Sequence, residues 1–96
     1  MSYRVELAPA AERDIKKRPP SVRRGTVEVH LPRIASDPLG QGPPLHGAFA
    51  HYWLYHFGRR PEYRIIYSVE EQTVTIKVIL VGTRESVYKR LRRRLA

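Results

Sequence analysis

Cysteine is absent from this chain of 96 residues, and so is any long apolar run. Without cysteine the protein has no disulfide framework and no thiolate chemistry, which fits a reducing cytoplasm. No apolar run is long enough to span a bilayer and no signal peptide is recognisable, so we expect a cytoplasmic protein without membrane contact. The length predicts one domain, residues 1–96, with a single modest core.

Several common types of active site are missing as well. No pair of carboxylates has a spacing that suggests acid–base catalysis, and no glycine-rich phosphate loop is present. His46, His51 and His56 are five residues apart, so successive members would point to opposite faces of a strand. We therefore expect neither a metal site nor a cofactor.

Acidic residues are scarce, with 9 Asp and Glu against 18 Lys and Arg, and the formal net charge is +9. Such an excess implies an anionic partner: nucleic acid, an acidic protein, or both in turn. The charge gathers in two clusters, residues 13–24 and residues 84–94. The first could be the solvated face of a helix, whereas the consecutive arginines at 92–94 repel one another unless a counter-charge is present.

Two β-rich stretches within residues 63–80 predict a hairpin that turns at residues 70–73. With Val69 opposite Val74, the alternation of side chains makes one face of the hairpin wholly apolar. That face consists of Tyr63, Ile65, Tyr67 and Val69 opposite Leu80, Val78, Ile76 and Val74. The other face, which includes Arg64, is expected to remain open and positively charged.

Shorter elements precede the hairpin. Residues 3–7 alternate in polarity and predict a strand, and residues 9–18 predict a helix that is broken by the two prolines after it. A second helix is expected to reach about Ser36, with a kink or an early end at Pro32. The expected buried positions are Ala11 and Ile15 in the first helix and Val27, Leu31 and Ile34 in the second.

A loop rich in proline and glycine follows at residues 37–47, and the next strand is expected at residues 51–57. After the hairpin, residues 84–95 predict a basic helix. The predicted fold class is therefore α+β, with the element order β-α-α-β-β-β-α. We expect a small sheet with mainly antiparallel strands, an N-terminal helical hairpin packed on one face, and a basic C-terminal helix.

Arginines gather at the end of the hairpin that lies away from its turn. Arg64 is near that end on the open face, Arg84 leaves the adjacent strand there, and Arg59 and Arg60 lie across from it. Converging guanidinium groups would form a phosphate clamp, because each presents a planar fork of donors. Tyr88 follows Arg84 by one helical turn and is expected to share its face.

Two motifs lie in this part of the chain. Residues 63–67 read Tyr-Arg-Ile-Ile-Tyr, and residues 81–88 read Val-Gly-Thr-Arg-Glu-Ser-Val-Tyr. Together they resemble the C-terminal half of the RelE/ParE toxin superfamily. The similarity extends to the opening strand, the two helices and a Leu-x-Gly step at residues 45–47, and so covers nearly the whole chain. It implies the toxin of a type II toxin–antitoxin system, with an acidic antitoxin as its partner.

The resemblance to the RelE type further implies a ribosome-dependent endoribonuclease. Such an enzyme cleaves mRNA by attack of the RNA's own 2′-OH and so inhibits translation. By position, Arg64 and Arg84 would stabilise the scissile phosphate, and Tyr88 would act in proton transfer or stack on a base. This metal-free chemistry needs cations at the phosphate and groups that move two protons. Each residue could instead have a structural role. Arg64 could be a solvent-facing strand residue, Arg84 could be an ion-pair partner, and Tyr88 could be a core aromatic.

The chain departs from the RelE type on the strand before the hairpin. Two basic residues are expected there, but this chain has Trp53 and Tyr55 or, without gaps, Phe57 and Arg59. At least one basic residue is missing, and His56 could replace it as general base because imidazole titrates near neutral pH. The candidate RNA-binding residues are Arg59, Arg60, Lys77, Lys89, Arg90, Arg92 and Arg93. The expected partners are the ribosome and mRNA, with DNA bound only through the toxin–antitoxin complex.

Two other functions fit the same resemblance. A ParE-like toxin would inhibit DNA gyrase by binding it, without nuclease chemistry, and the missing basic residue favours this alternative. A degenerate member would only bind an antitoxin or a nucleic acid. The nuclease differs from both in requiring that Arg64, Arg84 and Tyr88, or His56, converge within reach of one phosphate.

Overall fold

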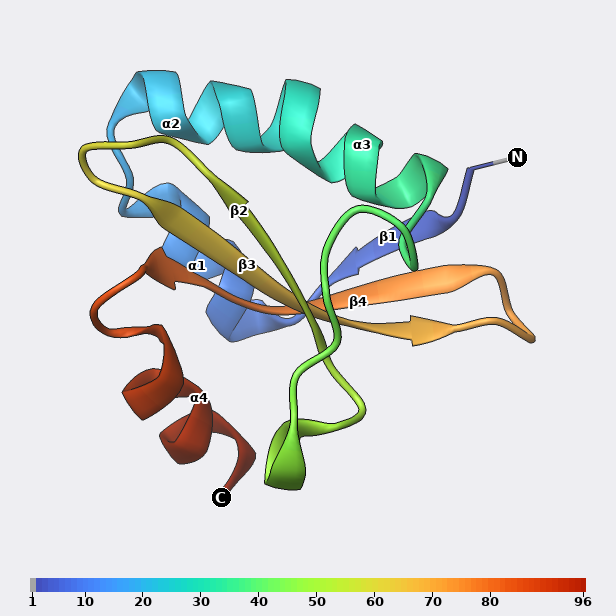
Figure 1. Cartoon of the computed structure of the whole chain (residues 1–96). Coiled ribbons are helices and arrows are strands. Elements are labelled where there is room, and N and C mark those ends of the chain that lie inside the picture. Colours follow the sequence, from blue (N-terminus) through green and yellow to red (C-terminus); the bar gives the residue numbers. More distant parts are fainter. Residues whose placement is uncertain (1) are drawn as a thin grey trace.

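A four-stranded mixed sheet organises the fold of residues 2–96, the part of the chain that the computed structural model describes. Its strands are β1 (Arg4–Leu7), β2 (Trp53–Phe57), β3 (Tyr63–Glu70) and β4 (Thr75–Thr83), in the spatial order β1-β4-β3-β2. β1 runs parallel to β4, and the other neighbouring strands are antiparallel (Figure 1). The predicted α+β class and element order are confirmed.

Helices cover one face of the sheet. They are α1 (Pro9–Lys16), α2 (Pro20–Gly25), a π-helical turn (Thr26–His30) and α3 (Leu31–Ser36). The last three follow one another without a break, so of the predicted kink or early end at Pro32 only the early end is wrong. The N–H of Leu31 donates to the carbonyl of Thr26, and this wider turn lets the helix continue past the proline.

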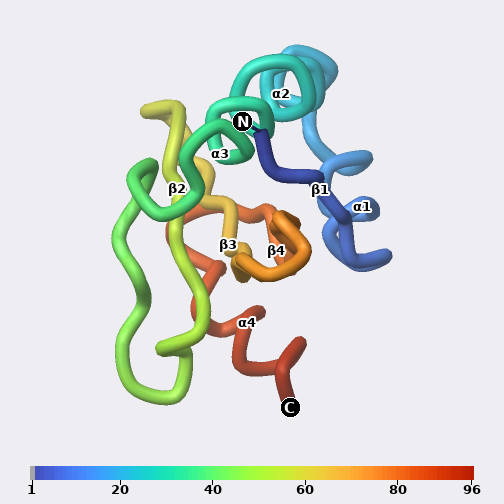
Figure 2. The backbone as a smooth tube through the Cα atoms, turned by 90° about the vertical axis from the view of Figure 1, so that its right-hand side faces the viewer, coloured from blue at the N-terminus to red at the C-terminus, as the bar shows by residue number. Residues whose placement is uncertain are grey.

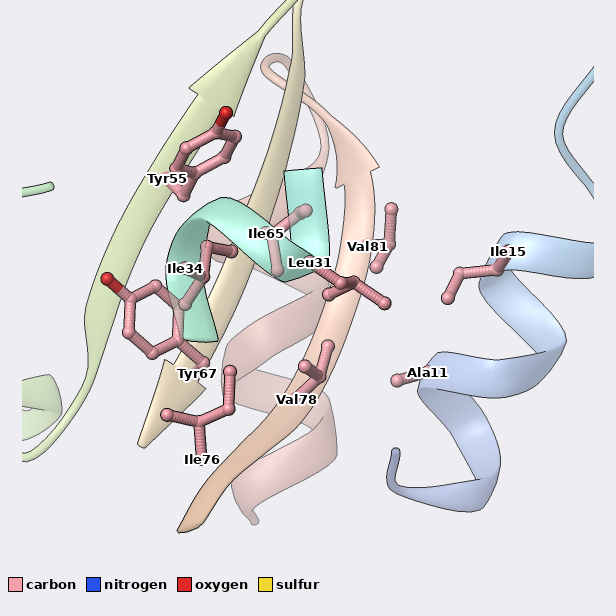
Figure 3. Close-up of a cluster of buried hydrophobic side chains, with 10 residues drawn as sticks. All are labelled: Ala11, Ile15, Leu31, Ile34, Tyr55, Ile65, Tyr67, Ile76, Val78 and Val81. Carbon is pink, nitrogen blue, oxygen red and sulfur yellow. The ribbon is translucent and has the colours of Figure 1, made fainter. Parts of the chain in front are cut away.

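The main core lies between the sheet and these helices (Figure 3). Its buried members are Ala11, Ile15, Leu31, Ile34, Tyr55, Ile65, Tyr67, Ile76, Val78 and Val81. Val27 was wrongly predicted to join them: it is exposed, because the extra residue in the π-helical turn rotates it away from the stripe. Burial, together with Asp37 and Tyr55, raises the pKa of Tyr67 to about 12, and the Tyr67 hydroxyl donates to the Pro38 carbonyl at 2.6 Å.

The pairing near the hairpin turn differs from the predicted register. Val69 lies opposite Ile76 rather than Val74, and the turn therefore occupies residues 71–74. Val74 adopts a left-handed φ of 50° in this turn. The sequence has no Asn-Gly or Asp-Gly signal that would fix the turn length. Because the shift is by an even number of residues, the side chains near the turn keep their predicted faces.

A β-bulge between Ile66 and Tyr67 changes the faces farther along the hairpin. Ile66 pairs with Leu80, while Tyr67 pairs with Val78. Leu80 therefore lies on the opposite face from the one predicted, and Val81 takes its place in the main core. A bulge inserts one unpaired residue, and nothing in the sequence marked its position.

The second face of the sheet is not open, as had been predicted, because α4 (Val87–Leu95) packs against it. Figure 2 shows α4 on one side of the sheet and α2 and α3 on the other. The buried residues of this smaller core are Leu45, Leu54, Ile66, Leu80, Val87 and Leu91. Leu45 comes from the loop before β2, which also contains a 3₁₀ turn (Gly47–Phe49). The end of the sheet beyond this core, away from the hairpin turn, carries polar side chains.

Candidate functional site

Arg64 is the central residue of a polar cluster at that end of the sheet. It is the second residue of β3, and its side chain points away from the main core, toward α4. Its Nε donates to the Glu62 carboxylate at 2.8 Å, and its Nη1 lies 3.5 Å from the Tyr88 hydroxyl. The guanidinium carbon lies 6.0 Å from the centroid of the Tyr88 ring. Arg64 is therefore held between a carboxylate and a phenol, with 19% of its side chain exposed.

Glu62 brings Arg84 to the same place. The backbone N–H of Arg84 donates to the Glu62 carbonyl at 3.0 Å, directly after the last pair of the β3–β4 ladder. The hydrogen bond from Arg64 is the main cause that lowers the pKa of Glu62; partial burial opposes it, and the charges of Arg64, His56 and Arg84 add to it. Two arginines and a histidine thus lie around one carboxylate.

His56 is the member of the cluster that comes from β2. It lies opposite Arg64 in the antiparallel register, so the two side chains share a face, and His56 is exposed. Tyr55 and Phe57 instead belong to the main core or pack against it, as does Trp53. The strand positions that face Arg64 are therefore His56 and the buried Leu54, which leaves a single titratable group there.

Tyr88 lies on the exposed side of α4, where 38% of its surface is accessible. The core interpretation of this tyrosine was wrong, since its neighbours Val87 and Leu91 fill the apolar contact instead. The predicted helix start at residue 84 was also too early, because Thr83 and Ser86 form a turn linked through their hydroxyls at 3.1 Å. This turn directs the first residues of α4 back toward Arg64.

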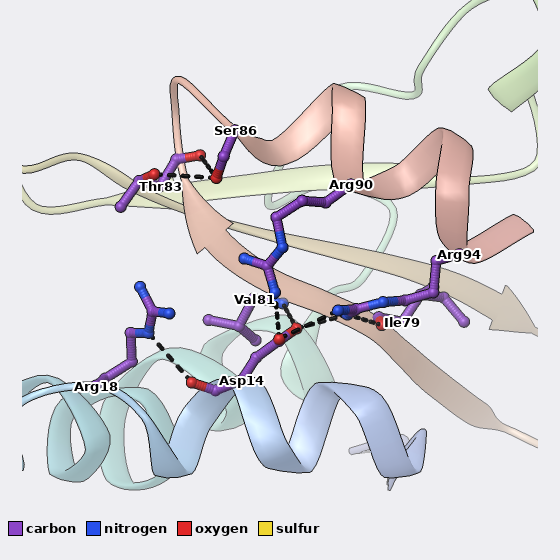
Figure 4. A network of polar contacts seen from close by, with 8 residues as sticks. All are labelled: Asp14, Arg18, Ile79, Val81, Thr83, Ser86, Arg90 and Arg94. Carbon is purple, nitrogen blue, oxygen red and sulfur yellow. Dashed lines mark hydrogen bonds and ion pairs between the residues drawn. The ribbon is translucent and has the colours of Figure 1, made fainter.

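A buried carboxylate fixes α4 in this position (Figure 4). Asp14 on α1 has only 3% of its side chain exposed and binds both Arg90 and Arg94. Its Oδ2 accepts the Arg94 guanidinium at 2.6 Å and the backbone N–H of Val81 at 2.9 Å. A Cβ on Gly82 would lie 2.8 Å from Arg90 Nη1, so the glycine of the motif leaves room for the arginine to reach Asp14.

The electrostatics of Asp14 follow from these contacts. Burial alone would raise the pKa of its carboxyl group. The hydrogen bonds from Arg94 and Val81 and the charges of Arg90 and Arg94 together outweigh burial and lower that pKa. The carboxylate is therefore ionised at neutral pH, and its charge neutralises part of the arginine-rich helix.

Comparisons with known proteins identify the family to which this chain belongs. No family model matches the chain. It is 30% identical over 90 residues to toxin RelG of Mycobacterium tuberculosis, covering 94% of this chain and all of that toxin. The chain belongs to the RelE toxin family. Toxin RelE of the same organism is 24% identical over 91% of this chain and 87% of its own length.

Solved structures of the family agree with the fold. The toxin–antitoxin complex RelBE2 of M. tuberculosis matches with a TM-score of 0.79 and 27% identity, over 88% of this chain and 100% of that chain. A mutant of the E. coli toxin RelE in the free state matches over the whole of both chains, with a TM-score of 0.78 and 24% identity. This match to E. coli RelE supports the similarity of the fold alone.

Most of the remaining RNA-binding candidates of this RelE-family chain lie on two exposed segments. Lys89, Arg92 and Arg93 are exposed on α4, and Arg59 and Arg60 are exposed in the loop between β2 and β3. Two candidates lie elsewhere. Lys77 is exposed in β4 about 20 Å from the cluster end of that strand. Arg90 points into the structure toward Asp14, so we exclude it from the RNA-binding surface.

One ion pair next to the site was not predicted from the sequence. The pairing of Asp14 with Arg94 was not predicted, although the 11, 14, 15 spacing with Ala11 and Ile15 places Asp14 on the buried side of α1. Within residues 2–96, no group of three or more metal-ligating side chains is present. In the same residues, no helix combines the length and apolar character needed to cross a membrane.

Proposed function

We propose that this protein is the toxin of a type II toxin–antitoxin pair and that it cleaves mRNA on the ribosome. The observation that carries the proposal is the convergence of Arg64, Arg84, Tyr88 and His56 at one end of the sheet. These side chains come from β3, the turn after β4, α4 and β2. They provide cations, a phenol and an imidazole, which together suffice for cleavage by an internal 2′-OH.

The two arginines bind the scissile phosphate. Glu62 engages the Nε of Arg64, which leaves the terminal edge of the guanidinium for two phosphate oxygens. Arg84 is exposed beside it and contributes a second cation. Negative charge on the phosphate increases in the transition state, so preorganised cations lower the barrier more than they strengthen substrate binding.

Two groups move the protons. His56, as a neutral imidazole, accepts the proton of the 2′-OH while O2′ forms a bond to phosphorus. The bond from phosphorus to O5′ breaks, and the leaving oxygen takes a proton from the hydroxyl of Tyr88, which lies beside Arg64. The products are a 2′,3′-cyclic phosphate and a 5′-OH end, and the balance requires neither a metal nor a cofactor.

The charge distribution suits the expected partners. The exposed arginines and lysines of α4 engage the ribosomal RNA backbone, and those of the β2–β3 loop contribute to RNA binding, in a salt-dependent, largely sequence-independent way. Related toxins have been solved in complex with antitoxins, including the RelBE2 complex of M. tuberculosis and the RelBE complex of E. coli. An acidic antitoxin of this kind would neutralise the same basic surface, and only that complex would bind DNA. Ribosomes are in the cytoplasm, where the proposed activity operates.

The test is cleavage of mRNA on programmed ribosomes, with the cut ends mapped. Wild type is compared with Arg84→Ala and with Arg13→Ala, a control that removes an exposed arginine of α1. We expect cleavage in the A-site codon with a 5′-OH end, reduced by about 10²-fold in Arg84→Ala and unchanged in Arg13→Ala. Absence of cleavage by folded wild type would refute the proposal.

One observation favours a second candidate function. On the face of β2 that carries His56, the adjacent side chain is the buried Leu54. Only one titratable group is therefore available on that face of the strand. A toxin that inhibits DNA gyrase by binding would not need a general base. Inhibition of gyrase supercoiling by a protein that leaves ribosome-bound mRNA intact would establish this alternative.

A further inference from the structure

A groove lies on the face of the sheet that α1, α2 and α3 cover, apart from the polar cluster around Arg64. It has a volume of about 410 Å³ and is bounded by α2 and by the loop that joins β2 to β3, which lie near each other in Figure 1. This volume lies within the range of small-ligand sites. The proposed chemistry does not account for the groove.

One wall of the groove is built from stacked rings. His30 stacks on Phe57 with centroids 4.0 Å apart, and Phe57 stacks on Tyr63 at 5.5 Å, with interplanar angles of 20° and 24°. His30 Nδ1 lies 2.7 Å from the Tyr55 hydroxyl, which fixes the orientation of the imidazole. Burial, and then the charge of Arg33, lower the pKa of His30. At neutral pH the wall is therefore aromatic and uncharged.

The rim of the groove is positively charged. Arg59 and Arg60 line it and are exposed, and no Asp or Glu lines it among residues 2–96. No ion pair within the described part of the chain engages either arginine. An aromatic wall beside unpaired cations is the combination that binds single-stranded nucleic acids, whose bases stack while their phosphates meet the cations.

We infer that the groove binds one nucleotide of single-stranded RNA, with its base on the face of His30 that Phe57 does not cover and its phosphate on Arg59 and Arg60. This rests on the proposed function, because the nucleotide belongs to the strand that is cleaved. Arg64 and its neighbour Tyr63 point to opposite faces of the same sheet end, so an RNA strand that passes over the β2–β3 loop contacts both sites. An acidic peptide would use the two arginines but would have no need for the stacked rings.

A glycine in the groove offers a clean test. Gly25 lines it from the last residue of α2 with a helical φ of −61°, and a Cβ built there meets only His30 Cδ2, at 3.9 Å. Gly25→Leu therefore fills the groove without strain, removes no cation, and improves helix propensity. Arg60→Gln removes one rim charge. Arg13→Gln is the control, because it lowers the net charge equally on an exposed part of α1.

The probe is a fluorescent hexa-adenylate with 2′-O-methyl groups, which resists cleavage by 2′-OH attack. Its affinity for the free protein is measured by anisotropy at several salt concentrations. We expect about tenfold weaker binding for Gly25→Leu and for Arg60→Gln, and less than about twofold for Arg13→Gln. Nucleotide-induced shifts of the His30 ring protons by NMR should disappear in Gly25→Leu.

Unchanged RNA affinity in folded Gly25→Leu would overturn the inference. Unchanged RNA affinity together with weaker binding of an acidic peptide would assign the groove to a protein partner instead, which equally overturns it. The catalytic proposal fails separately. Arg84→Ala should lose cleavage while keeping the nucleotide-induced shifts of the His30 ring protons, which report binding in the groove alone. A wild type that shows these shifts without cutting mRNA would refute only the catalysis.

Discussion

Replacement of Asp14 by asparagine is expected to weaken the fold substantially, because this carboxylate joins α1, β4 and α4. Loss of one partner from a buried ion pair costs about 3–5 kcal/mol. The two arginines here keep 26% and 23% of their side-chain exposure and can turn toward water, which relieves part of that cost. Asparagine also retains an acceptor for the N–H of Val81. We therefore expect Asp14→Asn to lower the free energy of unfolding by about 2 kcal/mol at pH 7.

Urea unfolding followed by circular dichroism measures this change. With a typical urea dependence for a small domain, the midpoint should fall by between about 1 and 2 M while the slope stays constant. The matched control is Glu12→Gln on the same helix, whose side chain is 53% exposed and forms an ion pair with Lys16. Its effect should stay within about 0.5 kcal/mol, since surface ion pairs contribute little.

The pH dependence of the same measurement tests the cause. The pKa of Asp14 is lowered in the folded state, so its ionisation stabilises the fold fully above the unfolded value of about 3.9. That contribution is lost as the pH falls through the lower folded value. The difference between wild type and Asp14→Asn should therefore be constant above about pH 5 and shrink in acid. A difference independent of pH, or a stability equal to wild type, would refute the electrostatic reasoning.

Three further predictions concern the site. His56→Gln should reduce the rate of mRNA cleavage by about 10²-fold or more and flatten the acid side of the pH–rate profile, whereas a full rate would exclude His56 as the base. Tyr88→Phe should slow single-turnover cleavage by about 10²-fold if the hydroxyl supplies the proton, and wild-type rates would limit Tyr88 to stacking. Gly82→Ala should lose about 1 kcal/mol in urea unfolding because its Cβ displaces Arg90, and this loss should vanish in an Asp14→Asn background; equal losses in both backgrounds would exclude that coupling.

The elements of the fold were predictable because local periodicity determines them. Alternating residues identified the strands, and the three- and four-residue spacing in the helices identified most of the positions that pack on the sheet. The turn of the hairpin and the bulge after Ile66 were not predictable, because they depend on how two strands fit between packed layers. The bulge moved Leu80 to the other face, which is why that face carries a second core instead of open charge.

The candidate site was predictable in part for a related reason. Arg64 kept its predicted face because the bulge adds its extra residue, Ile79, to β4 and leaves the alternation of β3 unbroken. Tyr88 reaches Arg64 by another route than the predicted helical spacing from Arg84, since Arg84 precedes α4 and the turn at residues 83–86 directs the helix back. The inward direction of Arg90 could not be predicted from α4 alone. It depends on Asp14, which is 76 positions away along the chain. Only the assembled fold distinguishes the arginines that hold α4 in place from those that face solvent.

The distance between Asp14 and its partners along the chain has a consequence for protein synthesis. The first strand, β1, has β4 as its neighbour in the described sheet. Asp14 cannot form its ion pairs until Arg90 and Arg94 have been synthesised. Chains emerge from the ribosome beginning at the N-terminus, at about 5–20 residues per second. Neither α4 nor Tyr88 can therefore take its final place until residue 94 has left the exit tunnel. If the protein cleaves mRNA on the ribosome as proposed, a nascent copy could not yet act on the ribosome that is making it.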